Sequence, residues 1–228
     1  MLIIFDVDGT LVGGESHDWT SFDQAIAAVL GSAPGAGFFD SLTEITAQAI
    51  VEAAIRASHR ETGLGLEERI RDEYLRRLGQ VHAANPLAFP ARSGVTALLR
   101  HLGGIPGVTV AIATGDWHST IALKLAAACI DVGAYPMATS SDARRRSEII
   151  RLAAQRANRS LADAVYVGDG LWDLRACREL GVPFIGTGSR TDRLMAAGAE
   201  HIVDVLEIAP FLAALRAASR PVRSVGPY

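Results

Sequence analysis

Near its N-terminus the chain reads Leu2-Ile3-Ile4-Phe5-Asp6-Val7-Asp8-Gly9-Thr10-Leu11. Four apolar residues run directly into a polar turn that contains a glycine, a pattern typical of a buried strand. Because the run is apolar at every position, both faces of the strand should be covered, which favours a parallel sheet between helices. The stretch therefore predicts an α/β fold.

Two aspartates follow the predicted strand directly. Asp6 and Asp8 lie at its carboxyl end, where ligands of open α/β sheets bind. Neighbouring carboxylates repel each other unless a proton or a cation intervenes, and Mg²⁺ is a hard cation that prefers oxygen ligands. We therefore expect a magnesium site here, with Gly9 providing the sharp turn. The alternative is an ordinary acidic turn after a strand.

The composition is that of a folded protein. The chain has 228 residues, of which 49% are hydrophobic, enough for one domain with a smaller insertion. With 22 basic and 25 acidic residues the formal net charge is −3, which predicts no nucleic-acid surface. Lys124 is the only lysine, so a catalytic lysine has almost no position to occupy.

The sequence predicts neither export nor membrane insertion. Met1 leads into the first strand without a basic leader or a cleavage site, and no apolar run reaches the roughly 18 residues that span a bilayer. Cys129 and Cys177 form no C-x-x-C motif and are expected to be buried free thiols in a reducing compartment. We expect a cytoplasmic protein.

Only helical patterns lie between the first strand and Pro90. Glycines and a proline between Gly31 and Gly37 interrupt them. Apolar residues at helical spacing predict helices over residues 19–29, 42–58 and 66–81. We expect residues 15–89 to form an inserted, all-helical domain.

From Ser93 onward, strand and helix patterns alternate. Helices are predicted over residues 95–102, 117–128, 149–157 and 172–180. Strands are predicted over residues 108–113, 134–138, 164–167, 182–185 and 202–203. The alternation indicates βαβ units and a Rossmann-like parallel sheet. Residues 1–14 and 90–217 would form this discontinuous core, and residues 218–228 a frayed tail.

Polar groups follow three of the predicted strands and should converge at one sheet edge: Asp6 with Asp8, Thr114, and Asp169 with Asp173. The motifs, in order, are D-V-D-G-T-L (6–11), A-T-G (113–115), an arginine-rich helix start (144–146) and V-G-D-G-L-W-D (167–173). Together they resemble the haloacid dehalogenase superfamily of phosphohydrolases over essentially the whole chain. The place of the helical insertion is similar to that of the small helical cap in this family.

The resemblance implies a Mg²⁺-dependent phosphatase that acts on a small phosphorylated metabolite. Asp6 would be the nucleophile and form an aspartyl-phosphate, and Asp8 would be the general acid and then the general base. Dehalogenating members lack an acid at the position of Asp8, so its presence favours phosphoryl transfer. Thr114 and the Gly115 N–H would bind a phosphate oxygen, whereas Asp116 would cap the next helix.

The resemblance also implies the metal ligands. Asp169 would bind Mg²⁺ together with the Asp6 carboxylate and the Asp8 carbonyl, and Asp173 would bind it directly or through water. Trp172 is unusual beside such a loop, and a packing role is equally expected for it.

The third motif departs from the family, whose members usually place a lysine there. Two alignments of the arginine run select Arg146 or Arg144; we expect Arg146 to be the cation, with Arg144 and Arg145 on a solvated surface. Lys124 is expected to be exposed in mid-helix, so that replacing it with alanine should be nearly neutral. This position argues against a phosphonate-cleaving enzyme that uses a Schiff-base lysine.

The cap should select the substrate. Candidate contacts are His17, Asp18 and Trp19 near its start and Arg56, His59 and Arg60 near the end of its second helix, although ordinary surface or packing roles are more common for such residues. Three alternative functions stay open, namely a phosphomutase, a phospho-accepting regulatory module and a catalytically silent ligand-binding protein.

Overall fold

The computed structural model describes residues 1–35, 37–58 and 65–219. Its centre is a six-stranded sheet with parallel neighbours throughout, in the order β3-β2-β1-β4-β5-β6. The strands are β1 (Leu2–Phe5), β2 (Thr109–Ala113), β3 (Met137–Ala138), β4 (Ala164–Gly168), β5 (Phe184–Gly186) and β6 (His201–Ile202). This order is that of a Rossmann-like sheet, so the predicted fold class is confirmed.

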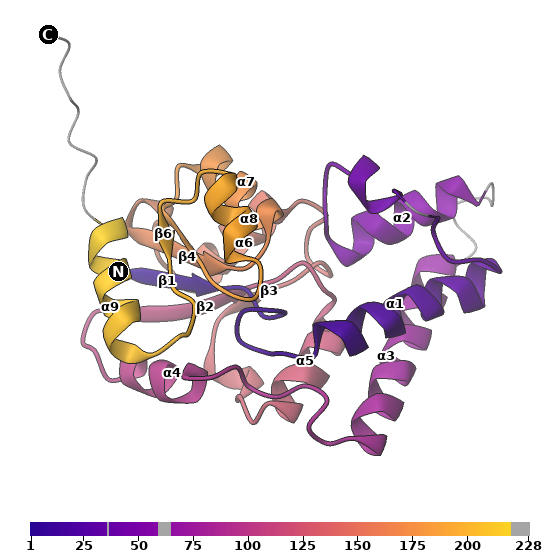
Figure 1. Cartoon of the computed structure of the whole chain (residues 1–228), viewed down its shortest axis with the longest axis horizontal. Coiled ribbons are helices and arrows are strands. Elements are labelled where there is room, and N and C mark those ends of the chain that lie inside the picture. The colour runs from indigo at the N-terminus through magenta and orange to yellow at the C-terminus, as the bar shows by residue number, and fades with distance from the viewer. Residues whose placement is uncertain (36, 59–64, 220–228) are drawn as a thin grey trace, which may run out of the picture.

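Helices cover both faces of the sheet (Figure 1). Successive strand residues face opposite sides, and accordingly Ile3 and Phe5 join one apolar cluster whereas Leu2 and Ile4 join the other. The first cluster includes residues of α4 (Val95–Gly103), α5 (His118–Ala127) and α9 (Ile208–Ala218). The second includes residues of α6 (Arg146–Arg156), α7 (Leu171–Leu180) and α8 (Thr191–Ala196). Burial on both sides explains the unbroken apolar run of β1.

The remaining helices form a separate body beside the sheet (Figure 1). They are α1 (Glu15–Leu30), α2 (Ala47–Ala57) and α3 (Leu66–Ala84), with a short 3₁₀ turn at Phe39–Ser41. We call the described residues between 15 and 89 the helical segment. Its α1 packs along α3, and α3 contacts α5 of the core. The described part of the segment contains no strand; the domain boundaries themselves stay a prediction.

Two element boundaries differ from the prediction for local reasons. α2 begins later than predicted, at Ala47, because the Thr46 hydroxyl caps it and accepts the Ala49 N–H at 3.3 Å. β5 begins later, at Phe184, because the Val182 N–H donates to the Cys177 carbonyl of α7 at 2.9 Å instead of to a strand. Both shifts show a hydrogen bond overriding an apolar pattern.

The C-terminal part is more helical than predicted. The sequence patterns do not predict α8 and α9, yet α9 buries Phe211, Leu215 and Ala218. The tail predicted beyond them lies largely outside the described residues. The expectation of buried thiols is confirmed for Cys177 but is wrong for Cys129, which is exposed and follows α5 with a φ of 57°.

None of the helices in the described residues has the length and hydropathy that a membrane crossing requires. The cytoplasmic location stays a prediction.

Candidate active site

The carboxyl ends of β1, β2 and β4 lie side by side and bring the predicted polar residues together. Asp6, Thr114 and Asp169 follow these three strands, and the Asp6 N–H extends the sheet by donating to Val167 at 2.9 Å. Asp6 and Thr114 are 3% and 2% exposed. With Asp8 they line a cavity of about 410 Å³, whose other walls come from both the helical segment and the core.

Gly9 allows the first motif to approach the fourth. It has a φ of 74°, and a Cβ atom at this position would lie 2.2 Å from Oδ2 of Asp169. Only a residue without a side chain can make this turn and leave room for the carboxylate. The glycine therefore sets the spacing between the two acidic loops.

Three carboxylates could hold a metal ion at this edge. Oxygen atoms of Asp6, Asp169 and Asp173 lie within 4.8 Å of one another. Burial, and then the charges of Asp6 and Asp173, raise the pKa of Asp169 well above its usual range. Like charges so close together require a proton or a cation between them. A divalent, oxygen-preferring ion suits three carboxylates beside a single arginine.

Asp173 is the most constrained of the three carboxylates and is fully buried. It accepts hydrogen bonds from the Tyr166 hydroxyl at 3.2 Å and the Gly170 N–H at 3.1 Å. Burial raises its pKa to about 7; Arg146 opposes this rise and Asp6 adds to it. Because its oxygens already have partners, Asp173 would contact a metal through water more readily than directly.

Arg146 is the arginine that reaches the nucleophile candidate. It begins α6, is 4% exposed, and places Nη1 3.2 Å from Oδ1 of Asp6 and Nε 3.4 Å from Oδ1 of Asp173. Its path depends on Gly115, where a Cβ atom would lie 2.4 Å from Nη2. The placement agrees with the alignment that selects Arg146, while its catalytic role stays a prediction.

The other two arginines point elsewhere. Arg144 Nε lies 2.7 Å from Glu52 Oε2 in α2. Arg145 pairs with Glu44 at 3.5 Å and Glu179 at 3.1 Å. Their side chains are 42% and 47% exposed, as expected for a solvated basic run.

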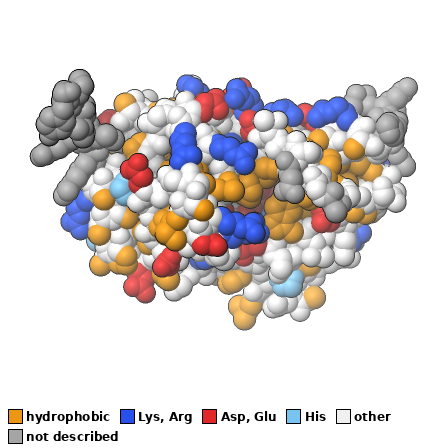
Figure 2. Space-filling view, turned by 45° about the horizontal axis from the view of Figure 1, so that its top comes forward, with side chains coloured by type: hydrophobic (Ala, Val, Ile, Leu, Met, Phe, Trp, Pro, Cys, Tyr) orange, Lys and Arg blue, Asp and Glu red, His pale blue; other side chains and the backbone are white. Residues whose placement is uncertain are grey.

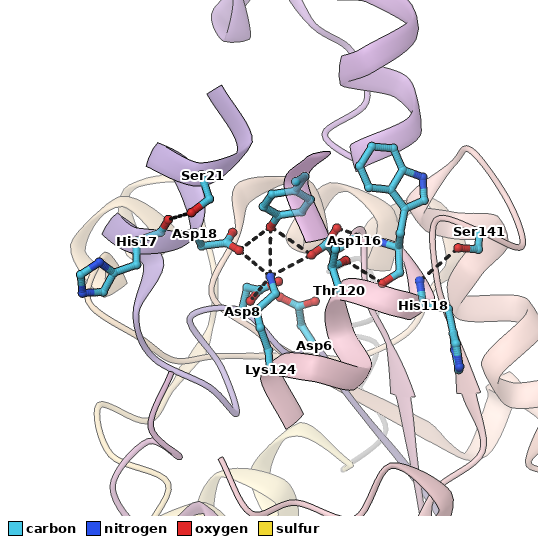
Figure 3. Close-up of polar contacts among 12 residues, drawn as sticks. Asp6, Asp8, His17, Asp18, Ser21, Asp116, His118, Thr120, Lys124 and Ser141 are labelled. Atoms are coloured by element: carbon cyan, nitrogen blue, oxygen red, sulfur yellow. Dashed lines mark hydrogen bonds and ion pairs between the residues drawn. The ribbon is translucent and has the colours of Figure 1, made fainter. Parts of the chain in front are cut away.

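Lys124 is buried beside the first motif, so the expectation that it is exposed is wrong. It is 0% exposed, and Figure 3 shows its ammonium group at the centre of three carboxylates. The distances from Nζ are 2.8 Å to Asp8 Oδ1, 2.6 Å to Asp18 Oδ1 and 2.8 Å to Asp116 Oδ2. Burial alone would lower the pKa of Lys124, but these carboxylates raise it well above its usual value. Such a permanently charged amine is unsuited to forming a Schiff base.

Tyr74 of α3 completes this group. Its hydroxyl donates to Asp18 and lies 3.2 Å from Asp116 Oδ2, and it accepts from Lys124 at 3.3 Å. We call Asp8, Asp18, Tyr74, Asp116 and Lys124 the lysine cluster. Asp116 also accepts the Trp117 N–H at 2.7 Å. The expectation that it caps the helix is wrong, because the N-cap of α5 is Trp117 and no side chain caps it.

No local motif reveals the lysine cluster, because its members come from four separate parts of the chain. One signal was available in α5, whose sequence His-Ser-Thr-Ile-Ala-Leu-Lys-Leu-Ala-Ala is apolar on most sides. A helix of this kind is buried, and a buried lysine must be paired with acids. The pattern therefore predicts partners for Lys124 but cannot name them.

The candidate cap contacts are only partly near the cavity. Asp18 and Trp19 line it, whereas the His17 carbonyl accepts from the Ser21 hydroxyl at 2.7 Å and its ring lies edge-on to Phe89. Arg56 is exposed and lies 3.8 Å from Glu52. His59 and Arg60 lie outside the described residues.

The cavity is largely apolar on the side of the helical segment. The apolar side chains of the segment that line it are Trp19, Phe22, Ile45, Ala47 and Ile50, and Trp172 of α7 adds one from the core. Figure 2 shows hydrophobic side chains gathered in the middle of one face, with basic side chains beside them. Arg92 and Arg190 also line the cavity, and Arg92 is paired with Glu15 at 3.3 Å.

Solved structures with this fold come from several bacteria. A hydrolase from Pseudomonas syringae is 18% identical with a TM-score of 0.75, and the match covers 96% of this chain and 99% of that one. CbbY from Rhodobacter sphaeroides, solved with phosphate, is 21% identical with a TM-score of 0.73, covering 94% and 98%. A β-phosphoglucomutase from Clostridium difficile is 14% identical with a TM-score of 0.71, covering 94% and 95%.

At these identities the structural likeness establishes the fold alone, and no curated protein matches the sequence. The family of haloacid dehalogenase-like hydrolases, in contrast, matches residues 1–181. This match spans the first, second, third and fourth motifs, and the chain therefore belongs to the haloacid dehalogenase-like hydrolase family.

Proposed function

We propose that the protein is a Mg²⁺-dependent phosphatase that hydrolyses a small phosphate monoester through an aspartyl-phosphate. The observation that carries this proposal is the setting of Asp6, a buried carboxylate at the cavity with Arg146 3.2 Å away and two further carboxylates beside it. A nucleophile that attacks a phosphoryl group needs such positive charge close by.

An oxygen of Asp6 would attack phosphorus and form a new P–O bond while the bond between phosphorus and the ester oxygen breaks. Burial raises the pKa of Asp6, while the Arg146 charge and a hydrogen bond from Thr114 oppose that rise. Arg146 thus favours the ionised, nucleophilic form. Thr114, which also lines the cavity, and the Gly115 N–H would bind phosphoryl oxygens during the transfer.

Asp8 would supply the proton that the leaving oxygen needs, and in the second step it would take the proton of the attacking water. Burial, opposed by Lys124 and reinforced by Asp18 and Asp116, raises the pKa of Asp8 well above its usual range. A carboxyl group with a raised pKa can carry a proton near neutral pH, which a general acid must do.

Asp6, Asp169 and the Asp8 carbonyl would hold the metal, with Asp173 behind them. Bound Mg²⁺ would supply charge that offsets the carboxylates and the phosphate. The remaining steps belong to the side chains: Asp6 bonds to phosphorus, Arg146 orients Asp6, and Asp8 moves the proton.

We infer that the helical segment acts as a cap that excludes water during the first step. Its apolar residues at the cavity, Trp19, Phe22 and Ile50 among them, suit the organic part of an ester. CbbY was also solved with xylulose 1,5-bisphosphate, and a structure with this fold from Haemophilus somnus is described as a predicted phosphoglycolate phosphatase. Small phosphorylated metabolites are therefore the substrates to test.

The experiment is a panel of phosphorylated metabolites assayed with Mg²⁺ for release of inorganic phosphate, with Asp6→Asn as the inactive reference. We expect release from at least one monoester by the wild type only. Isomerisation without release would instead support a phosphomutase, an alternative raised by the likeness to β-phosphoglucomutases. Release that persists in Asp6→Asn would contradict the mechanism.

A further inference from the structure

We propose that Lys124 is a positioning residue for Asp8, and that it acts through an ammonium group shared with the helical segment. The inference rests on the proposed function and deepens it, because it concerns the acid–base step of the same site. Lys124 itself does not reach the substrate: it is 0% exposed, whereas Asp8 lines the cavity in front of it.

The geometry leaves the ammonium group fully occupied. An ammonium nitrogen has three N–H donors; Nζ donates to Asp8 Oδ1, Asp18 Oδ1 and the Tyr74 hydroxyl, and Asp116 Oδ2 lies 2.8 Å away as a further ion-pair partner. One of these partners is Oδ1 of Asp8, so this oxygen has a fixed place relative to α5. A general acid must be within hydrogen-bond reach of the atom it protonates, and a carboxylate held at one oxygen meets that requirement with little freedom to turn away.

The partners of Lys124 come from both parts of the molecule. Asp8 and Asp116 belong to the core, whereas Asp18 lies on α1 (Figure 3). Tyr74 lies on α3. If the helical segment moved away from α5, Lys124 would lose Asp18 and Tyr74 and keep two carboxylates. The position of Asp8 is therefore tied to the seating of the segment on the core.

The charge of the cluster makes this link strong. One ammonium faces three carboxylates in a buried site, and removing the ammonium would leave these carboxylates without their partner. Tyr74 adds a neutral donor to Asp18, which holds the two segment residues together. A purely structural ion pair would require none of these groups to lie at the cavity, yet Asp8, Asp18, Tyr74 and Asp116 all line it.

The test uses the dependence of the rate on the leaving group. A general acid matters most when the leaving oxygen is basic, so its loss should slow phenyl phosphate much more than p-nitrophenyl phosphate. For Lys124→Met we expect kcat/KM with Mg²⁺ to fall about a hundredfold for phenyl phosphate and about tenfold or less for p-nitrophenyl phosphate. kcat/KM reports the first chemical step, in which the leaving oxygen takes its proton.

Lys124→Arg should recover part of the loss on phenyl phosphate, because it keeps the positive charge. Arg144→Met is the matched control, since Arg144 also joins the core to the helical segment, through Glu52 at 2.7 Å, but does not contact Asp8. We expect it to leave the ratio of the two kcat/KM values unchanged. Asp18→Asn keeps Lys124 and the shape of the site, and we expect the same selective loss at about tenfold on phenyl phosphate.

Thermal unfolding of each variant shows whether it is folded, and Asp18→Asn carries the test if Lys124→Met does not fold. A selective loss on phenyl phosphate in the folded variants supports the proposal. An equal loss on both substrates, in Lys124→Met or in Asp18→Asn, means that the cluster only stabilises the fold and overturns it. Turnover of p-nitrophenyl phosphate by the wild type tests the proposed function separately.

Discussion

Two buried cations lie behind the two aspartates of the first motif, and they are assembled differently. Arg146 contacts the carboxylates of Asp6 and Asp173, which both belong to the core, and the only described group of the helical segment to which its guanidinium donates is the Ile45 carbonyl, at 3.4 Å. Lys124 contacts Asp8 and Asp116 of the core but also Asp18 of the helical segment. The carboxylates that share a cation with Asp6 thus all come from the core. One of the carboxylates that share a cation with Asp8 comes from the helical segment.

Each of the two places holds one cation and three carboxylates, but the carboxylates are arranged differently. Beside Arg146, the carboxylates of Asp6, Asp169 and Asp173 have room for a metal ion among them. Around Lys124, the carboxylates already converge on one nitrogen atom. One place can therefore take a cation from solution, whereas in the other the ammonium group of Lys124 already holds the central position.

The largest effect should come from the nucleophile. Asp6→Asn removes the negative charge that attacks phosphorus but keeps the shape of the side chain, so kcat/KM for the best monoester should fall by several orders of magnitude. Far-UV circular dichroism should be unchanged. A variant that retained more than about a tenth of the wild-type rate would be incompatible with an aspartyl-phosphate.

Removal of the metal should lower the rate almost as much, because it affects the carboxylates beside Arg146 and not the lysine cluster. Excess chelator should abolish turnover, Mg²⁺ should restore it, and Ca²⁺ should restore it poorly because its coordination is larger and looser. Mg²⁺ should also raise the Tm of the wild type and not that of Asp169→Asn, because a ligand that binds the folded state stabilises it.

Asp163→Asn is the matched control for the metal, since this exposed aspartate precedes β4 at the opposite end of the strand from Asp169. It should keep the Tm shift. Full activity in excess chelator, with no metal found by elemental analysis, would remove the metal from the mechanism.

Arg146→Ala tests whether Arg146 and Lys124 act on different parts of the reaction. Loss of one positioned donor to the transition state typically costs about a hundredfold or more in rate, and the phosphoryl charge is similar for every ester. We therefore expect equal losses for phenyl and p-nitrophenyl phosphate, in contrast to the selective loss in Lys124→Met. Because Arg146 is buried, its removal should also destabilise the fold by about 3–5 kcal/mol, measured by urea unfolding.

A leaving-group dependence in Arg146→Ala as steep as that of Lys124→Met would mean that the two cations serve the same step. The separate roles assigned to them would then be wrong.

The two groups of residues also differ in how well the sequence predicts them. The motif residues could be placed at one sheet edge because each follows a strand, and parallel strands align their carboxyl ends. These residues are Asp6, Asp8, Thr114, Asp169 and Asp173. The apolar runs of β1 and β4 made those strands easy to find. In both cases a short stretch of chain carries the whole signal.

The lysine cluster could not be predicted in this way, because it depends on how α1 and α3 pack against α5. The apolar stripe of α5 predicts only the face of the helix that packs on the sheet. Lys124 lies instead where α5 meets α1 and α3, through Asp18 and Tyr74. Long-range packing is therefore the part that the local patterns leave out.

α8 was not predicted because six residues are too few for a periodic pattern. α9 was not predicted although its buried residues Phe211, Leu215 and Ala218 recur at helical spacing.

The smallest effects should come from the two neighbours of Arg146. Arg144→Ala and Arg145→Ala remove ion pairs whose arginine side chains are 42% and 47% exposed, and exposed pairs contribute little because water and salt screen them. We expect kcat/KM to stay within about twofold of the wild type for both aryl phosphates. The measurement also decides between the two alignments of the third motif. A large loss in Arg144→Ala with none in Arg146→Ala would place the functional cation at Arg144, against the 3.2 Å contact between Arg146 and Asp6.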